Sequence, residues 1–595
     1  MAANKNTLIP DWYEGELPPR SYRSIFKWGA PREFKHPNRR LYQLMKDTFG
    51  LSDADFQQPV SLGLDAVDAK VPVGLSAEQV AALENIVGPD NLTSETYARL
   101  KAGYGAGAID ALRLRHGIIE NIPDVVVHPR HKQDVEQIVH YCNAQGIAVY
   151  VYGGGSSVTR GFEAVKSGVT LDMGTHMNKV LAFNETNQTI TVQPGIFGPA
   201  MEDILNHAPE KFNAARAYTC GHFPQSFEYS TVGGWVVTRG AGQNSTYYGK
   251  IEDLVLSQEY VTPIGTVKTQ DYPRQATGPD LDQILIGSEG AFGVLVAVTL
   301  KVFHYTPQNR VPFSYMFKSW EDAQAAARQI MQAEYGYPSV FRISDPEETD
   351  VAMKLYGIEG TPADSLLNLL GFQPMQKCLM LGYTDGDRVF SRTLARRIRQ
   401  TCRLYGAFNL SPFGVTQRWE HSRFRDPYMR EDLADYGILI DTLECAVTWA
   451  DLPRVHAGVR AVVKSRPQTI CMTHISHAYP QGANLYFIFI ARITDIDEYL
   501  QLQYRVLQAI QDNGAAMSHH HGVGKQTAPW LEGQIGAQYM AMLKSLKQHF
   551  DPNNIMNPGG TLGLDMSPQQ AAKTWGMRET EATNMEENHV AAELA

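Results

Sequence analysis

The sequence predicts an α+β protein whose two main regions differ in how strands and helices alternate. Up to about residue 305 short strands are frequent and long helices are few, whereas from about residue 311 helices alternate with strands. An Asn-, Pro- and Gly-rich segment at 549–560 then predicts a C-terminal segment that returns to the first region. With 595 residues, the chain is long enough for about three domains or two large ones.

The expected elements follow the chain in order. Residues 1–119 mix proline-rich irregular stretches with helical ones, and their sequence indicates no function. A β-branched run at 123–130 precedes an amphipathic helix at 131–146 that ends at a glycine. The remaining expectations are a strand running into a glycine turn at 147–161, strands at 168–173, 189–195, 251–262 and 292–303, and, after residue 311, helices at 319–336, 387–406 and 498–514 with strands at 378–383 and 483–493.

Composition and charge exclude several classes of protein. Lys and Arg number 53 against 63 Asp and Glu, so the net charge is −10 and no basic block is available to neutralise nucleic-acid phosphates. The six cysteines form no CxxC pair, which is typical of a reducing compartment and argues against a cysteine zinc site. Neither a signal peptide nor an apolar run of about 20 residues is recognisable, so we expect a cytoplasmic protein.

A run of small residues, Gly153 to Ser157, follows the strand that ends at Tyr152. Consecutive glycines let backbone N–H groups converge on an anion, and the two serines add hydroxyl donors, so the ligand indicated is a pyrophosphate. The run is neither GxGxxG nor a Walker loop. Taken alone, it is explained equally well by a tight turn.

Two further glycine segments strengthen the hypothesis of a dinucleotide. One is a small-residue loop at 224–235, followed closely by Thr-Arg-Gly-Ala-Gly at 238–242, and the other lies at 287–294. We expect the glycine turns at 153, 233 and 290 to lie at strand ends in one sheet region. A long dinucleotide needs several such close approaches along its length.

Together, GGGSSV, STVGG with TRGAG, and GSEGAFGV resemble the vanillyl-alcohol-oxidase/PCMH-type FAD-binding family. Within it, the chain is similar to the alkyldihydroxyacetonephosphate (alkylglycerone-phosphate) synthases at 220–239, 247–255, 518–525 and 551–560. The resemblance implies a PCMH-type two-subdomain FAD-binding domain plus an α/β cap domain with a large antiparallel sheet. The expected division is an N-terminal helical and irregular extension at 1–119, the FAD-binding domain at 120–310, the cap or substrate domain at 311–548, a segment at 549–565 that returns to the FAD domain, and a polar tail at 566–595 that is a mobile or peripheral arm.

The resemblance also implies a cofactor and a reaction. FAD is expected to be bound tightly but noncovalently, because no His or Cys immediately precedes the glycine turn. The implied reaction exchanges the acyl group of acyl-dihydroxyacetone phosphate for a fatty alcohol through a flavin N5 adduct, in ether lipid synthesis. The expected FAD-binding residues are Val151, Tyr152, Gly153, Gly154, Gly155, Ser156, Ser157, Gln225, Ser226, Ser230, Thr231, Gly233, Gly234, Thr238, Arg239, Gly240, Ala241, Glu289, Gly290, Gly293 and Val294.

Three consecutive histidines, His519, His520 and His521, are expected to form a mobile, polar and potentially cationic loop. From the residues alone, a surface cluster, a metal site and a clamp for phosphate and substrate remain open. The resemblance favours the clamp and implies catalytic roles for this triplet and for Tyr486, the acid/base tyrosine. A phenol with a usual pKa of about 10 needs a cationic neighbourhood to lose its proton readily.

Further side chains are assigned by the same resemblance. Arg430 matches the substrate-binding arginine of the family, and a forked guanidinium suits a phosphate. Thr442 and Glu444 follow on the next strand and are expected to shape the same pocket as substrate-binding residues. Arg342 matches an arginine needed for activity, and His222 matches a pocket histidine beside the flavin. We therefore expect Arg430 and the histidine loop to form the phosphate site, with the acid/base tyrosine between them and the flavin.

No metal is expected. The C-terminal half also resembles FAD-linked D-2-hydroxyacid dehydrogenases, which hold a divalent ion with a GHxGDGNLH segment and the Glu of an EHG motif. Here Tyr486 replaces the second His and His520 replaces the Glu, so two of the three ligands are missing. His474 and His477 remain candidates for the pocket lining.

An FAD-linked D-2-hydroxyacid (D-lactate-type) or alcohol dehydrogenase or oxidase on the same scaffold is the alternative function. The expected partner is a phosphorylated, lipid-like small molecule rather than a nucleic acid, and the expected assembly is a homodimer. The segment 365–375 is apolar enough to gate a lipid tail or to contact a membrane peripherally, although an ordinary core helix shows the same pattern.

Overall fold

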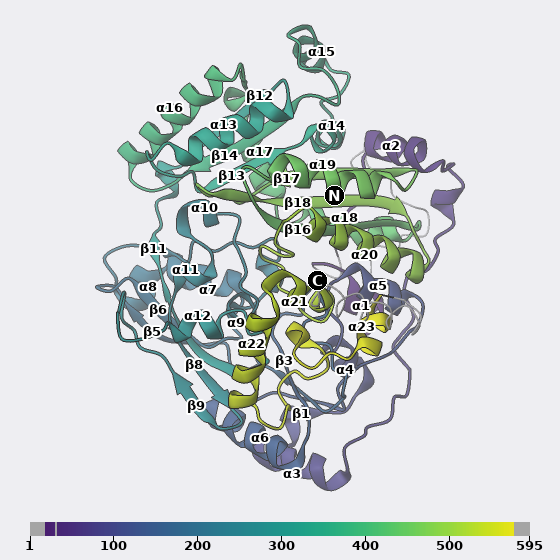
Figure 1. Cartoon of the computed structure of the whole chain (residues 1–595), viewed down its shortest axis with the longest axis vertical. Coiled ribbons are helices and arrows are strands. Elements are labelled where there is room, and N and C mark those ends of the chain that lie inside the picture. The colour runs from purple at the N-terminus through teal and green to yellow at the C-terminus, as the bar shows by residue number, and fades with distance from the viewer. Residues whose placement is uncertain (1–17, 30–32, 576–595) are drawn as a thin grey trace.

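A computed structural model describes residues 18–29 and 33–575, which form two halves (Figure 1). One half holds two small sheets and a two-stranded pair of β7 (Tyr218–Thr219) with β11 (Phe303–His304), and the other holds a single large sheet with helices packed on it. Across the described part of the chain, no helix is both long enough and apolar enough to cross a membrane.

The first small sheet has the order β1-β2-β4-β3, with β1 (Leu92–Thr93) antiparallel to the rest. Strands β2 (Val125–Val127), β4 (Val169–Asp172) and β3 (Val149–Tyr152) run parallel. Helix α6 (Lys132–Gln145) connects β2 to β3, ends at Gly146 with a φ of 66°, and packs with α3 (Ala77–Val87). This is the strand–helix–strand order expected from the sequence at 123–161.

The second small sheet is antiparallel, in the order β5-β6-β10-β8-β9. The strand expected at 251–262 is shorter, because its first residues form the turn of helix α11 (Ile251–Leu254), where Asp253 accepts the Lys250 N–H at 3.0 Å. The strands are β5 (Val180–Asn184), β6 (Thr189–Val192), β8 (Val255–Thr262), β9 (Gly265–Lys268) and β10 (Val294–Lys301).

The large sheet has seven antiparallel strands in the order β15-β12-β14-β13-β17-β18-β16, which confirms the predicted antiparallel sheet. Helices α13 (Trp320–Gln332), α16 (Arg388–Leu404), α19 (Leu452–Lys464) and α20 (Ile496–Asp512) contribute to the buried core on one face of it. The strands are β12 (Val311–Phe317), β13 (Val340–Ser344), β14 (Cys378–Thr384), β15 (Phe408–Asn409), β16 (Ile438–Thr448), β17 (Thr469–Ile475) and β18 (Gly482–Arg492).

Side chains alternate between the two faces of this sheet. On β18, Leu485 and Phe487 join the helix-covered core, whereas Tyr486 between them lines a cavity. On β13, Phe341 is in that core, and its neighbour Arg342 lines the same cavity. The face without this helical core therefore forms one wall of the cavity.

The C-terminal end of the described chain packs on the body of the protein. After α22 (Ala537–Phe550), Met556 pairs in parallel with Val149 of β3, and the Asn557 N–H donates to the Val149 carbonyl at 2.8 Å. The beginning of the tail, predicted to be a mobile or a peripheral arm, forms helix α23 (Pro568–Thr574), and Trp575 is buried against Trp530. The remainder of that tail, 576–595, lies outside the described residues.

Candidate active site

A cavity of about 480 Å³ lies where the two halves and the N-terminal extension meet. The open face of the large sheet forms one wall, and the glycine segments form the opposite one. The N-terminal extension closes a third side with Trp28, Lys35, Leu41 and Met45, of which the last two come from helix α2 (Arg39–Phe49).

The first glycine turn leaves strand β3 and borders the cavity from Gly153 to Val158. Its packing is tight: a Cβ on Gly154 would lie 2.0 Å from the Tyr229 carbonyl oxygen, and one on Gly153 would lie 2.3 Å from Thr231 Oγ1. Among the described residues, the backbone N–H groups of Gly154 and Gly155 have no acceptor. Glycine is therefore required here by close packing, and the turn offers free donors of the kind that a pyrophosphate needs.

The sequence analysis expected the three glycine turns to lie at strand ends in one sheet region, but the structure places them in different elements. Gly153 ends a strand of the first small sheet, and Gly290 precedes β10 of the second. Gly233 lies in the first turn of helix α9 (Val232–Val237), behind the N-cap Thr231. The turns still meet because all three line the same cavity between the sheets.

Most of the predicted FAD-binding residues border the cavity, but Arg239 and Val294 do not. The Arg239 guanidinium donates to the side chain and carbonyl of Gln283 and to the Ile286 carbonyl, so it packs behind the third glycine segment and not in the cavity. Val294 is fully buried in the apolar core beneath the first small sheet. Glu289 does border the cavity, and its carboxylate accepts the N–H groups of Val523 and Gly524 at 2.6 and 2.7 Å.

The histidine loop is held by Glu444 of β16. The Glu444 carboxylate accepts the backbone N–H groups of His519, His520 and His521 at 2.7, 3.0 and 3.0 Å, and the Ser518 hydroxyl at 2.7 Å. Burial alone would raise the pKa of Glu444, but the facing histidines and these donors lower it to about 2, so the carboxylate is charged. The loop is thus anchored rather than mobile, with His519 buried and His520 and His521 half-buried.

The imidazoles of this loop are neutral, which corrects the expectation of a cationic cluster. Burial lowers the pKa of His520 to about 3 and also lowers the pKa values of His519 and His521 below their usual range. His520 and His521 line the cavity, whereas His519 lies behind them and hydrogen-bonds the Tyr479 hydroxyl at 2.8 Å. The loop can donate hydrogen bonds to an anion, but it does not supply positive charge at neutral pH.

Tyr486 lies at the centre of the open sheet face, opposite Glu444 on β16 and His474 on β17. Its hydroxyl donates to Thr442 Oγ1 at 3.1 Å, and its ring stacks on those of His474 and His520, with centroids 4.9 and 5.8 Å away. Burial raises the pKa of Tyr486 to about 12, although Arg430 acts in the opposite direction. Burial outweighs the one cationic neighbour, Arg430, so Tyr486 keeps its proton at neutral pH.

Two of the predicted arginines line the cavity. Arg430, on helix α18 (Met429–Ala434), uses Nε for Glu431 at 2.6 Å and Nη2 for the Ala106 carbonyl at 2.7 Å. Among the described residues, Nη1 of Arg430 has no recorded partner. Arg342 pairs with Glu348 and lies 3.1 Å from His474 Nδ1. These guanidinium groups bring positive charge to the cavity, which also has Lys35 in its lining, and Glu431 and Glu348 offset part of that charge.

Two predicted pocket residues lie behind the wall rather than in it. Glu444 supports the histidine loop from below and is 2% exposed. His222 packs against Trp235 at 4.8 Å, close to Gly240, and neither of its ring nitrogens has a hydrogen-bond partner among the described residues. Burial, the dominant cause, lowers the pKa of His222 to about 3.

Other lining residues were missed by the sequence analysis. The Trp28 ring lies 5.4 Å from the Arg430 guanidinium, and Arg423 donates to the Tyr383 hydroxyl at 3.1 Å beside the cavity. No local motif marks either residue. The only sequence signal for the contact between this extension and helix α18 is the presence of basic residues such as Arg23 and Lys27, which pair with Asp432 of that helix.

Comparison with known proteins places this cavity in a wider class. Residues 123–270 match the FAD binding domain, and residues 306–561 match the C-terminal domain of FAD linked oxidases. A solved alkyldihydroxyacetonephosphate synthase is 27% identical with a TM-score of 0.76, covering 90% of this chain and 99% of that one. A p-cresol methylhydroxylase with substrate bound shares the fold, with a TM-score of 0.62 at 16% identity.

The donor set fits the cofactor that these families bind: a glycine turn with free N–H groups opens into a cavity that reaches the large sheet. The chain is thus a flavoprotein of the PCMH-type fold with FAD as its cofactor. The alkyldihydroxyacetonephosphate synthase of Dictyostelium discoideum is 31% identical over 504 residues, 81% of this chain and 80% of the relative, and that of Trypanosoma brucei brucei is 27% identical over 577 residues. The chain belongs to the alkyldihydroxyacetonephosphate synthase family, which confirms the resemblance seen in its sequence.

Proposed function

We propose that the protein exchanges the acyl group of acyl-dihydroxyacetone phosphate for a fatty alcohol. The bond between the dihydroxyacetone carbon and the acyloxy oxygen breaks, and the fatty acid leaves with both carboxyl oxygens. The alcohol oxygen bonds to the same carbon to form the ether, the alcohol proton balances the departing carboxylate, and no net oxidation occurs. One observation carries the proposal beyond family membership: polar groups and a long apolar wall share one cavity. The apolar wall consists of Leu41, Met45, Val351, Leu355, Leu433, Ile440, Met472, Ile488 and Ile490.

The chain's own residues suit this reaction in distinct ways. Bound FAD supplies an electron-accepting ring that can carry the reacting carbon. Tyr486, protonated and hydrogen-bonded to Thr442, can give a proton to the reacting centre and take it back. Arg430 offers a guanidinium nitrogen to a phosphate, and the neutral His520 and His521 offer ring N–H donors. The apolar wall accommodates the hydrocarbon chain.

The decisive experiment compares two reactions of the purified holoprotein. We expect a labelled fatty alcohol to enter the ether product when acyl-dihydroxyacetone phosphate is supplied, and we expect no flavin reduction by D-2-hydroxy acids. Flavin reduction by a D-2-hydroxy acid without alcohol incorporation would favour the dehydrogenase, the second candidate. Acid precipitation should release the flavin into the supernatant if it is bound noncovalently, as we propose.

Single-residue variants then test the proposed roles. Tyr486→Phe should lower turnover with FAD still bound, whereas Tyr504→Phe, at a ring packed on Trp530 outside the cavity, should not. Arg430→Gln should weaken substrate binding by about one to two powers of ten, because a charge-assisted hydrogen bond contributes about 1.5–3 kcal/mol. Full activity in Tyr486→Phe, or equal use of phosphate-free substrates, would contradict these roles.

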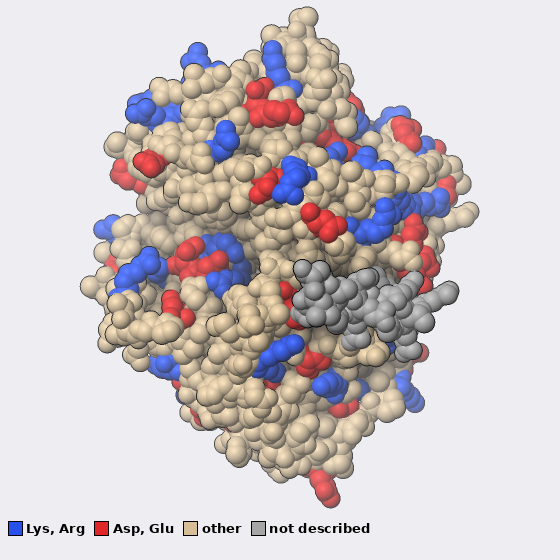
Figure 2. Space-filling view, viewed as in Figure 1, with Lys and Arg blue, Asp and Glu red and all other residues tan. Residues whose placement is uncertain are grey.

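We also propose that the tip formed by helix α15 (Pro362–Leu369) contacts a lipid surface. Leu369 is 84% exposed, and Leu366, Leu370 and Met375 are also exposed around it. This tip projects from the molecule in Figure 1, and its outermost part is free of charged residues in Figure 2. Leu366→Glu combined with Leu369→Glu should reduce co-flotation with phospholipid vesicles while activity on a detergent-dispersed substrate is retained.

We also propose that the protein forms a homodimer, because two-fold symmetric dimers are the commonest oligomers of enzymes. Light scattering coupled to gel filtration tests it: a mass near that of one chain would contradict it.

A further inference from the structure

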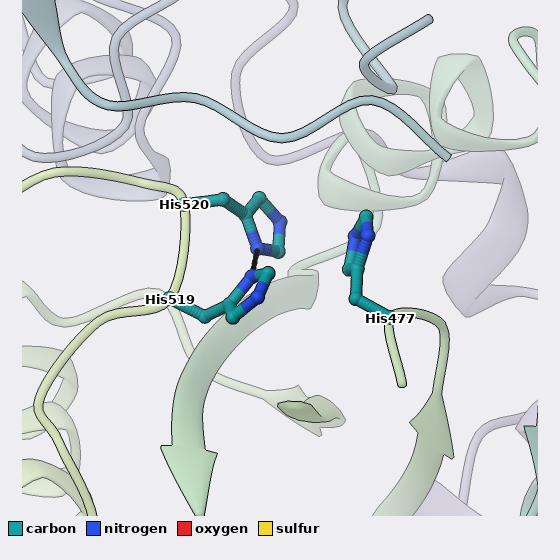
Figure 3. A group of neighbouring side chains, drawn as sticks. All are labelled: His477, His519 and His520. Carbon is teal, nitrogen blue, oxygen red and sulfur yellow. Dashed lines mark hydrogen bonds between the residues drawn. The ribbon is translucent and has the colours of Figure 1, made fainter. Parts of the chain in front are cut away.

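We infer that His477, His519 and His520 form a binding site for one late first-row divalent ion such as Zn²⁺, open toward the substrate cavity. This differs from the sequence-based expectation of no metal, which rested on a ligand set using the positions of Tyr486 and His520. Of the three proposed ligands, His477 lies just after β17, and His519 and His520 belong to the histidine loop. The three side chains gather in one place in Figure 3.

The spacing of the ring nitrogens suits an ion. One nitrogen from each of the three rings lies within 4.8 Å of the others. The Nδ1 atoms of His519 and His520 share a hydrogen bond at 3.1 Å, whose proton an ion would displace (Figure 3). That separation is close to the roughly 3.3 Å between two ligands of a tetrahedral zinc with bonds of about 2.0–2.1 Å. The His477 ring lies within 25° of parallel to that of His519, so it must turn for both lone pairs to meet at one ion.

Hydroxyl groups hold the outer nitrogens of two of the rings. The Ser245 hydroxyl bonds His477 Nδ1 at 2.7 Å, which leaves Nε2 for an ion, and the Tyr479 hydroxyl bonds His519 Nε2 at 2.8 Å, which leaves Nδ1. Such outer hydrogen bonds orient metal-binding imidazoles and commonly affect affinity by 10- to 100-fold. Three imidazoles with no thiolate favour Zn²⁺, Ni²⁺ or Cu²⁺ over Mg²⁺ or Ca²⁺.

Nearby charges act in both directions. The Glu444 carboxylate lies 3.5 Å from His520 Nδ1 and favours a cation, whereas Lys250, whose ammonium donates to the His519 carbonyl at 2.7 Å, opposes one. His477 and His520 border the cavity, so an ion held between them would lie beside the space proposed for the substrate. If the proposed exchange reaction is correct, an ion bound here blocks the approach of substrate and inhibits turnover.

Equilibrium dialysis of the chelator-treated holoprotein with Zn²⁺ tests the binding site directly. We expect one ion per chain in addition to weak surface binding, at least tenfold weaker binding in His477→Gln and in Ser245→Ala, and no change in His549→Gln, whose imidazole is exposed elsewhere. FAD content and circular dichroism identify a variant that fails to fold, in which case His519→Gln replaces it.

Two results would overturn the inference: less than one ion bound per chain, or equal affinity in His477→Gln and the unaltered protein. Inhibition is measured separately, as the loss of alcohol incorporation over the same Zn²⁺ range and its reversal by chelator. Stoichiometric binding with no exchange activity in any sample would contradict the proposed function and leave the metal site standing. Binding without inhibition would overturn the claim that the ion lies beside the substrate.

Discussion

The buried charge cluster that ties the N-terminal extension to helix α18 gives a quantitative prediction for Asp432→Asn. One Asp432 oxygen accepts Arg23 Nη2 and Lys27 Nζ, each at 2.7 Å, and the other accepts the Lys35 N–H at 2.6 Å. The side chains of Arg23, Lys27 and Asp432 are 1%, 0% and 2% exposed. The variant keeps the size of the side chain but removes the charge that compensates two buried cations.

The magnitude follows from that burial. Removing one partner of a buried ion pair costs about 3–5 kcal/mol, because a charge is left uncompensated in a poorly solvated place. Arg23 retains Asp435 at 2.7 Å, so we take the lower end, about 3 kcal/mol. If the extension opens locally, amide exchange there should accelerate about 10²-fold, since each 1.4 kcal/mol is about a factor of ten.

Hydrogen exchange of peptides covering residues 18–29 and 33–45 measures this acceleration in the holoprotein. Asp47→Asn is the matched control, because Asp47 is an exposed carboxylate on the same extension. Lys27→Met should have a smaller effect, since Asp432 then still pairs with Arg23. Exchange in Asp432→Asn within about threefold of the control would refute the reasoning, because it would mean that the cluster contributes nothing net to docking.

Three further outcomes are expected. Gly154→Ala should lose FAD, measured as flavin per chain, because its Cβ would lie 2.0 Å from the Tyr229 carbonyl oxygen. Glu444→Gln should cost about 2–3 kcal/mol of unfolding free energy in denaturant titrations, since it removes the charged acceptor of three backbone N–H groups. His222→Phe should flatten the pH dependence of stability: the folded pKa of about 3 lies below the usual value, so the neutral imidazole stabilises the fold above pH 6.5 and that stability is lost as the pH falls. Between pH 6.5 and 5 the unaltered protein should lose about 1.6 kcal/mol more than this variant, and equal slopes would contradict the assignment.

Much of the fold could be predicted because its signals are local. The glycine turn after Tyr152 and the helix ending at Gly146 depend on neighbouring residues, and their elements begin and end within a few residues of expectation. The cavity could be predicted only as a set of motifs. That Gly233 belongs to a helix and Gly290 to a different sheet from Gly153 depends on contacts between segments far apart in the chain, which no local pattern encodes.

The charge state of the site could not be predicted for a related reason. Three adjacent histidines suggest positive charge when they are imagined in water, but burial removes that charge from His519, His520 and His521. Glu444, expected beside the substrate, instead faces the backbone of the loop, because a carboxylate is the acceptor that several converging N–H groups require. The residue types therefore predicted which side chains gather at the cavity, whereas their charge states and hydrogen-bond partners depend on burial.

Burial also separates the two kinds of chemistry that the proposed reaction needs. A phosphate needs fixed positive charge, and a guanidinium keeps its charge in such surroundings, which suits the phosphate-binding role proposed for Arg430. A proton that leaves and returns needs a group that still holds it at neutral pH, and the burial that neutralises the imidazoles keeps the Tyr486 phenol protonated. The same exclusion of water that disqualifies the histidines as cations therefore makes the tyrosine suitable as the proton carrier. A more hydrated loop would weaken both features at once.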